Sequence, residues 1–330
     1  MQYGFSIKRK CYLLSVLLMT VWLTGCVQEE FESTPSPAGN GIRFTLTVPD
    51  VNLPSVSSRT MTGTGTAKKE DEIETVDILV FDMSKTPAVF LEWVSATGVT
   101  QDLADNSTVS FSAVLSPTTA STCIVVVANK ELDNIVSGFT KGATTKVEAM
   151  EKMLHTQTGK WLADGSTTGG YTRIPMYGEK VISKITPSMN PITEINMKRM
   201  LARIDIRNNS VTSNFMVEEV YLANYNTTGY IAPAWNTNGQ VTEPAPDTPV
   251  LPTGSGKMTE EGNAILYSVN GNTPYDGEIY TFESLAAGDA GGAGQDGEAS
   301  RKDATCLIVK GKIGTGESTF YRVDFTKTGN

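Results

Sequence analysis

The sequence has one histidine, His155, and lacks the short motifs that usually mark a catalytic or metal site. No HExxH, CxxC or phosphate-loop pattern occurs in it. His155 follows a stretch with helical spacing and has no second imidazole or cysteine partner at a suitable distance in sequence, so we expect a surface or helix-end residue. The neighbouring carboxylates of Glu218 and Glu219 fall in an expected strand, where adjacent side chains point to opposite faces. We therefore predict no catalytic residue, no cofactor and no metal ion.

Cysteine is scarce as well, with four in the whole chain. Cys11 lies in an N-terminal apolar segment and Cys26 follows it, whereas Cys123 and Cys306 lie in apolar runs far apart in the sequence. Two buried free thiols are expected for this second pair in preference to a disulfide. The stability of the protein must then come from its sheets.

Basic residues do not balance the acidic ones, and the formal net charge is −9 at pH 7. Loss of residues 1–25 would remove three basic and no acidic residues, leaving 24 against 36 and a charge of −12. Because so acidic a chain binds phosphate backbones poorly, we expect no nucleic-acid partner. The remaining length exceeds one typical core and indicates two domains.

The apolar run at the N-terminus, Cys11–Trp22, is too short to cross a bilayer comfortably and follows three basic residues. We interpret residues 1–25 as a removable signal peptide. The sequence Leu23-Thr24-Gly25-Cys26 resembles the lipobox of bacterial lipoproteins, which implies that Cys26 carries acyl chains such as palmitate. Multiple acyl chains would anchor the protein without a transmembrane helix. The alternative is a plain secretory signal with a chance cysteine; residues 26–40 form an acidic tether in either case.

The segment 41–59 contains an alternating strand and, after it, an arginine. Apolar residues at every second position predict one buried face, formed by Ile42, Phe44, Leu46 and Val48. Residues 51–72 are rich in Ser, Thr, Gly, Pro and charge and cannot build a core. A protease that cuts after Arg59, before Thr60, would free the strand from its covalent tether. The alternative is that Arg59 is an ordinary solvated loop residue, as most loop arginines are.

Further strands are predicted from alternating or continuous apolar runs at 73–81, 88–95, 108–114, 123–128, 215–225, 228–232, 264–269, 278–283, 305–312 and 319–326. One or two short helices are expected within 132–154. In 192–206 the apolar positions change parity, which indicates a bulge or bend in one long strand that passes between domains. We predict an N-terminal β-sandwich domain, 41–198, and a C-terminal one, 199–330.

The order and spacing of several segments resemble the major fimbrillin family of Bacteroidales, whose members are type V pilins. These segments are the alternating strand after Gly39-Asn40-Gly41, the linker with Arg59, the strands 73–81 and 124–129, Ile174-Pro175-Met176-Tyr177-Gly178, Arg199 with Leu201-Ala202-Arg203-Ile204-Asp205, 306–312 and 320–325. The resemblance covers nearly the whole chain after the signal peptide. No single motif carries it alone.

The resemblance implies a lipoprotein precursor with two transthyretin-like β-sandwich domains and one or two short helices in the first. Such a precursor is held at the outer membrane by its lipid until an arginine-specific protease cuts the linker, here after Arg59. The first strand is then lost, and a strand from another fimbrial subunit fills its groove. The implied product is a cell-surface fimbrium that serves adhesion, with other fimbrial subunits as partners.

The chain departs from the family pattern where it ends, at Asn330, because family members continue with further strands. We expect a truncated sequence in preference to a subunit that cannot donate a strand. Stalk, tip and anchor positions all stay open. The alternative function is an uncut surface lipoprotein, either a fimbrial anchor or a module that binds glycans or protein. In that case Trp161 and Trp235 could stack on sugar rings, although such aromatics usually cap a core.

Overall fold

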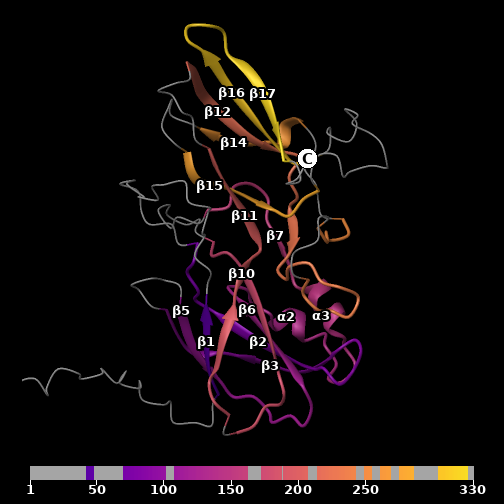
Figure 1. Ribbon diagram of the computed structural model, residues 1–330. Coiled ribbons are helices and arrows are strands. Elements are labelled where there is room, and N and C mark those ends of the chain that lie inside the picture. The colour runs from indigo at the N-terminus through magenta and orange to yellow at the C-terminus, as the bar shows by residue number, and fades with distance from the viewer. Residues whose placement is uncertain are drawn as a thin grey trace, which may run out of the picture. The chain divides into compact units, whose positions relative to one another are not determined.

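The computed structural model describes residues 42–47, 70–101, 108–162, 172–187, 189–206, 214–242, 249–254, 261–268, 275–285 and 304–325 (Figure 1). In these ranges the chain forms many β-strands, two short α-helices and one 3₁₀ turn, η1 (Glu261–Asn263). The prediction of a mainly β protein with one or two short helices is confirmed.

The N-terminal half forms a sandwich of two sheets, with strand orders β4-β5-β1-β9 and β10-β8-β6-β2-β3. The first sheet consists of β1 (Ile42–Thr47), β4 (Thr97–Gln101), β5 (Thr108–Ala113) and β9 (Ile192–Asn196). The second consists of β2 (Val76–Asp82), β3 (Val89–Ser95), β6 (Thr122–Ala128), β8 (Met176–Ile182) and β10 (Lys198–Arg199). One hydrophobic cluster contains side chains of both sheets, so they pack face to face.

Strand β6 occupies the centre of the second sheet, between β2 and β8, and all of its residues are buried. Ile124 and Val126 point into the core between the two sheets. Val125 and Val127 point to the opposite face and belong to another hydrophobic cluster. Burial on both faces explains the continuous apolar run and confirms the predicted central strand.

Two helices pack against that opposite face of the second sheet, α2 (Asp133–Val136) and α3 (Lys146–Lys152) (Figure 1). A capping box starts α3, because the Thr145 side chain accepts a hydrogen bond from the Glu148 amide and the Glu148 carboxylate accepts one from the Thr145 amide at 2.7 Å. Val136, Ala149 and Met150 join the cluster beneath the helices. The apolar spacing that predicted helices therefore marks their buried faces.

The C-terminal half contains a four-stranded sheet of order β14-β12-β16-β17 and a two-stranded sheet, β11-β15. Their bounds are β11 (Leu201–Ile206), β12 (Phe215–Ala223), β14 (Ile265–Ser268), β15 (Tyr275–Phe282), β16 (Cys306–Ile313) and β17 (Thr319–Asp324). Val220, Tyr267 and Ile279 are fully buried in the core that these sheets share. The second predicted β-sandwich is thus present.

The two halves are joined by a small sheet and by a shared core. Strand β7 (Leu154–Thr156) pairs antiparallel with β13 (Thr228–Tyr230). Ile231 and Phe282 lie in the same hydrophobic cluster as Met150 of α3. Because this core draws on both ranges, the division into 41–198 and 199–330 stays a prediction.

Three local expectations were wrong. Segment 192–206 is three strands, β9, β10 and β11, with breaks at Met197 and Met200, so the change of parity marks two corners in place of one bulge. The second helix ends at Lys152, and Leu154 belongs to β7. His155 lies in that strand, partly buried, with its ring centroid 5.0 Å from that of Trp161.

Cys123 and Cys306 are both buried and form no disulfide, as predicted. Within the described ranges, no helix has the length and apolar character needed to cross a membrane.

Candidate functional site

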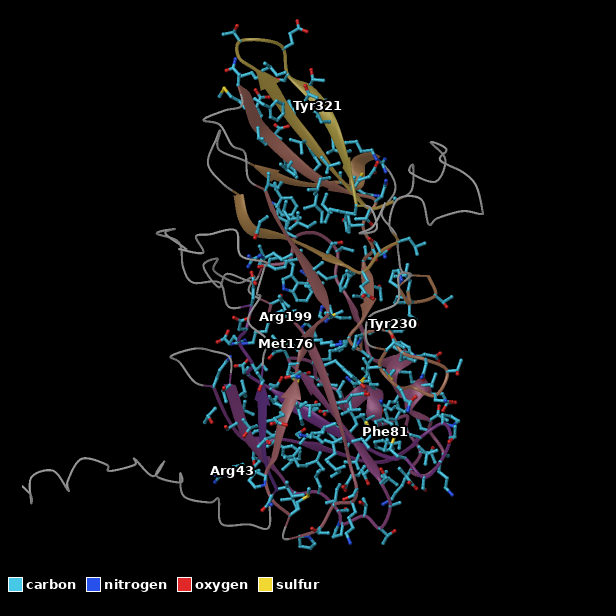
Figure 2. All side chains as sticks on the ribbon, viewed as in Figure 1. Arg43, Phe81, Met176, Arg199, Tyr230 and Tyr321 are labelled. Atoms are coloured by element: carbon cyan, nitrogen blue, oxygen red, sulfur yellow. The ribbon has the colours of Figure 1, made fainter. Side chains whose placement is uncertain are left out.

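Strand β1 is the element around which the candidate site is built. It lies inside its sheet, antiparallel to β5 on one side and parallel to β9 on the other. Ile42, Phe44 and Leu46 are at most 6% exposed, whereas Arg43 lies on the other face of the strand (Figure 2). The predicted alternation is confirmed for these positions. The strand expected to be removable is therefore fully integrated into the sandwich.

Phe44 has the most specific surroundings of the three buried side chains. It lies opposite Phe111 of β5, and the two rings stack with centroids 5.0 Å apart and planes inclined by 7°. On the other side Phe44 is aligned with Ile192 of β9. A large apolar side chain at this position fills a pocket between the neighbouring strands.

Strand β9 depends on β1 for its backbone pairing. It is the edge of its sheet, and β1 is its one strand neighbour among the described residues. The register shifts between Phe44 and Leu46, and the Met197 amide donates to the Thr47 carbonyl at 2.9 Å where β9 ends. Loss of β1 would therefore leave two unpaired edges, those of β5 and β9.

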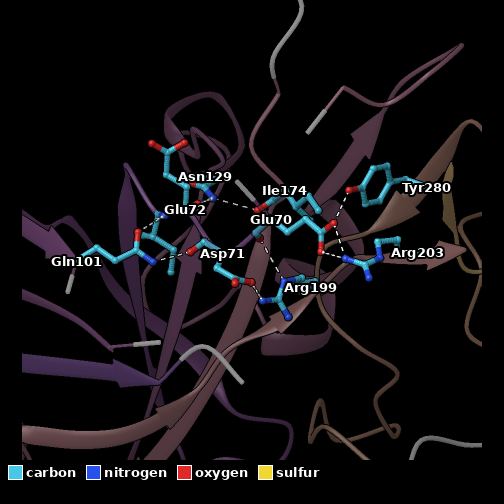
Figure 3. A network of polar contacts seen from close by, with 10 residues as sticks. Glu70, Asp71, Glu72, Gln101, Asn129, Ile174, Arg199, Arg203 and Tyr280 are labelled. Atoms are coloured by element: carbon cyan, nitrogen blue, oxygen red, sulfur yellow. Dashed lines mark hydrogen bonds and ion pairs between the residues drawn. The ribbon is translucent and has the colours of Figure 1, made fainter. Parts of the chain in front are cut away.

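A network of polar contacts holds the chain where it re-enters the described structure after the linker. We call Glu70, Arg203 and Tyr280 the Glu70 knot (Figure 3). Arg203 Nη1 lies 2.9 Å from both carboxylate oxygens of Glu70, and the Tyr280 hydroxyl donates to Glu70 Oε1 at 2.6 Å. The Glu70 side chain is 7% exposed. Its charge is thus buried and matched by a guanidinium and a phenol.

Electrostatics keeps the partners of Glu70 in their donor forms. Burial, together with the hydrogen bond to Glu70, raises the pKa of Tyr280 above its ordinary value of 10.0. Burial alone would lower the pKa of Arg203, but hydrogen bonds to Asp205 and Glu70 outweigh it and raise that pKa. A phenol and a guanidinium therefore face Glu70 at any pH near neutrality.

The residues directly after Glu70 are tied to the first sandwich. Gln101 Nε2 donates to the Asp71 carbonyl at 2.7 Å, and Asn129 Nδ2 donates to the Glu72 carbonyl at 2.7 Å. Arg173 forms an ion pair with Glu74 at 2.7 Å. Arg199 of β10 also contacts this stretch, through Asp71 (Figure 3). The chain downstream of the linker is therefore held by both halves of the molecule.

The family model for the major fimbrial subunit protein (FimA) matches residues 42–300 of the sequence. The chain belongs to this family. It is a fimbrial subunit of the Bacteroidales type, a structural protein of cell-surface fimbriae that assembles with other fimbrial subunits, and not an enzyme.

Three of the solved structures to which the chain is similar are described as fimbrial proteins. The tip fimbrial protein Mfa3 from Porphyromonas gingivalis, with a C-terminal truncation, is 16% identical, with a TM-score of 0.45 and coverage of 87% of this chain and 83% of that one. A fimbrial assembly protein from Parabacteroides distasonis is 12% identical, with a TM-score of 0.43 and coverage of 87% of both chains. The fimbrial anchor protein Mfa2 from Porphyromonas gingivalis is 12% identical, with a TM-score of 0.35 and coverage of 86% and 81%. A comparison with curated proteins found no match.

The remaining site residues predicted from the sequence lie outside the described residues. They are Cys26 for lipidation, Arg59 and Thr60 for cleavage, and Val48 at the end of the removable strand. The Glu70 knot was missed. Glu70, Arg203 and Tyr280 are visible in the sequence, but nothing in their spacing brings them together.

Metal binding and sugar stacking were the other kinds of site to check among the described residues. No group of three or more His, Cys, Asp or Glu side chains among them is arranged to hold a metal ion. Trp161 is 4% exposed, and its indole N–H donates to the Thr172 carbonyl at 2.9 Å, so a sugar ring cannot stack on it. Trp235 packs edge-on against Tyr230 and against the shared core.

Proposed function

We propose that this fimbrial subunit is exported as a lipoprotein acylated at Cys26 and is activated by an arginine-specific protease that cuts after Arg59. The cut releases β1, and a strand of another subunit takes its place. The observation that carries the proposal is the position of β1: it lies inside its sheet, yet residues 48–69 alone join it to the chain that follows. The new N-terminus would be Thr60.

The geometry of the vacated place supports strand exchange. Departure of β1 would expose backbone donors and acceptors on β5 and β9, together with the pockets of Ile42, Phe44 and Leu46. An extended segment with apolar residues at alternate positions satisfies both requirements at once. Burying three such side chains contributes about 6 kcal/mol, at about 2 kcal/mol each. In the uncut precursor β1 occupies this place and blocks premature assembly.

The Glu70 knot supports the segment before Glu70 as the place of the proposed cut. Because the chain is held from Glu70 onward, a cut at Arg59 would leave the β2 strand and the sandwich behind it attached. Residues 60–69 would then span at most about 35 Å from the knot. Cleavage would remove β1 without loosening the rest of the fold.

The test is the N-terminal residue and lipid content of the protein recovered from the cell surface, by Edman sequencing and intact mass. We expect Thr60 without lipid on the native protein, and an uncut, acylated form for Arg59→Lys. Arg43→Lys is the matched control, because Arg43 lies within β1, opposite Ser112 of β5, and should not matter for cleavage.

An acylated Cys26 on the mature surface protein would overturn the proposal. It would leave an uncut fimbrial anchor or a binding lipoprotein, the alternative that the sequence left open.

A further inference from the structure

The edge strand β9 has to stay in place if the vacated groove is to accept a strand. In the uncut protein it pairs with β1, and among the described residues no other strand pairs with it. At Met197 the chain leaves this sheet and enters the other one, where β10 pairs with β8. After β1 departs, β9 must be held by contacts across the sandwich.

Gly178 of β8 provides the closest of these contacts. A Cβ atom placed on Gly178 would lie 2.7 Å from Met197 Sδ, 2.8 Å from Ile195 Cγ2 and 3.0 Å from the Asn196 carbonyl oxygen. Real Cβ atoms essentially never approach other atoms more closely than 3.0 Å. The end of β9 therefore rests directly on the backbone of β8, where any side chain would push it away.

Neighbouring residues of β8 also contact β9. Side chains at alternate positions share a face, so Met176, Gly178 and Lys180 all face β9. Lys180 Nζ donates to the Thr193 carbonyl at 2.5 Å. Its ion pair with Glu194 is long, at 3.7 Å, and the Glu194 side chain is 86% exposed, so that pair adds little. Strand β8 therefore contacts β9 near both of its ends, and these contacts do not involve β1.

We propose that Gly178 is a positioning residue for strand exchange, which seats β9 on β8 and keeps the groove at the width of one strand after β1 has left. This inference rests on the proposed function. The hydrogen bond from Lys180 to the Thr193 carbonyl is a second, weaker contact that holds β9 on β8. The partner is an extended strand with large apolar side chains at alternate positions, matching those of β1.

The experiment follows the uptake of a fluorescein-labelled peptide with the sequence of residues 41–49 by fluorescence anisotropy. The acceptor is the chain without its signal peptide, carrying Cys26→Ser and cut after Arg59, with the cut verified by N-terminal sequencing. Gly178→Ala should weaken peptide affinity at least about tenfold, equivalent to about 1.4 kcal/mol. Its uncut form should keep a folded β9, because β1 still pairs with that strand.

Gly311→Ala is the matched control. A Cβ on Gly311 would lie 2.5 Å from the Met216 carbonyl oxygen, so the clash is comparable, but it falls in the other sandwich. This variant should take up the peptide like the native protein. Lys180→Met removes the second contact without adding bulk, and we expect about a threefold loss of affinity.

The outcomes separate the two proposals. If the native cut protein takes up no peptide, the proposed function fails. If the native cut protein and the Gly178→Ala variant bind the peptide equally well, the proposed role of Gly178 in positioning β9 is refuted. Should Gly178→Ala fail to fold when uncut, Lys180→Met decides, and undiminished uptake by that variant overturns the inference. Equal losses in Gly178→Ala and Gly311→Ala would also contradict it, since general destabilisation would then explain both.

Discussion

At the scale of single residues, Phe44 is the largest buried side chain of β1. Its ring is fully buried and stacked on Phe111. Phe44→Ala removes this stacking and leaves a cavity, and we expect the free energy of unfolding of the uncut protein to fall by about 3–5 kcal/mol. Urea unfolding measures it. Thr45→Ala, on the opposite face of β1, is the control and should change stability by less than about 1 kcal/mol.

A second residue-scale prediction concerns pH. Burial, with a smaller contribution from the positive charge of Lys130, lowers the pKa of His155 from 6.5 to about 4. Between these values the unfolded chain binds a proton that the folded chain does not, so stability falls as the pH drops from about 6.5 towards 4. Above pH 6.5 the imidazole is neutral in both states and has no effect.

Since His155 is the one histidine in the sequence, its titration can be followed by NMR in protein without a histidine tag. When the pH is lowered from 7 to 5, the free energy of unfolding of His155→Gln should fall less than that of the native protein. A midpoint near 6.5 in the folded protein would contradict the predicted burial effect.

At the scale of elements, the Glu70 knot ties the start of the β2 segment to β11 and β15. Arg203→Met leaves the Glu70 carboxylate buried without its cation, and we expect a loss of about 3–5 kcal/mol in unfolding free energy. The double variant Glu70→Leu/Arg203→Met removes both charges and should lose less than the single variant. Denaturant unfolding measures both.

An exposed pair provides the control for the knot. Lys312 and Glu218 lie 3.2 Å apart at partly exposed positions of β16 and β12. Lys312→Met should lower the free energy of unfolding much less than Arg203→Met does. A double variant as unstable as Arg203→Met alone would show that packing, and not charge, governs the knot.

The sequence predicts those elements whose side chains repeat regularly. Alternation identifies β1, and a continuous apolar run identifies β6. Strand β4 was not predicted, because Val99 is its one apolar residue and gives no pattern. Strand β7 was concealed because Leu154 continues the helical spacing of Met150, although the helix has already ended. Pairing with β13, which is distant in the sequence, decides its conformation.

Contacts between distant residues are the part that local patterns cannot supply. Glu70 meets Arg203 and Tyr280 across separations of 133 and 210 residues. Strand β1 was predictable, since its alternation is a local pattern. That it can be removed stays a proposal. Its interior place in the sheet, and the dependence of β9 on it, follow only from tertiary pairing.

At the scale of the whole molecule, the shared core predicts cooperative unfolding. Side chains from both halves form one cluster, and β7 pairs with β13 across them. We therefore expect a single thermal transition, with a calorimetric enthalpy equal to the van't Hoff enthalpy. Two resolved transitions would contradict this and would favour two sandwiches that unfold independently.

Under the proposed function, the interior position of β1 also sets the timing of assembly. While the linker is intact, β1 competes for its own groove at an effective concentration on the order of millimolar. A strand from another subunit with the same intrinsic affinity, at micromolar concentration, is then outcompeted by about a thousandfold. Cleavage of one peptide bond turns the tethered strand into a separate molecule. Once this strand is diluted, it no longer competes effectively for the groove. Under the proposed function, the cut acts as a clock for assembly at the cell surface, because it changes concentration and leaves the intrinsic affinity of the groove unaltered.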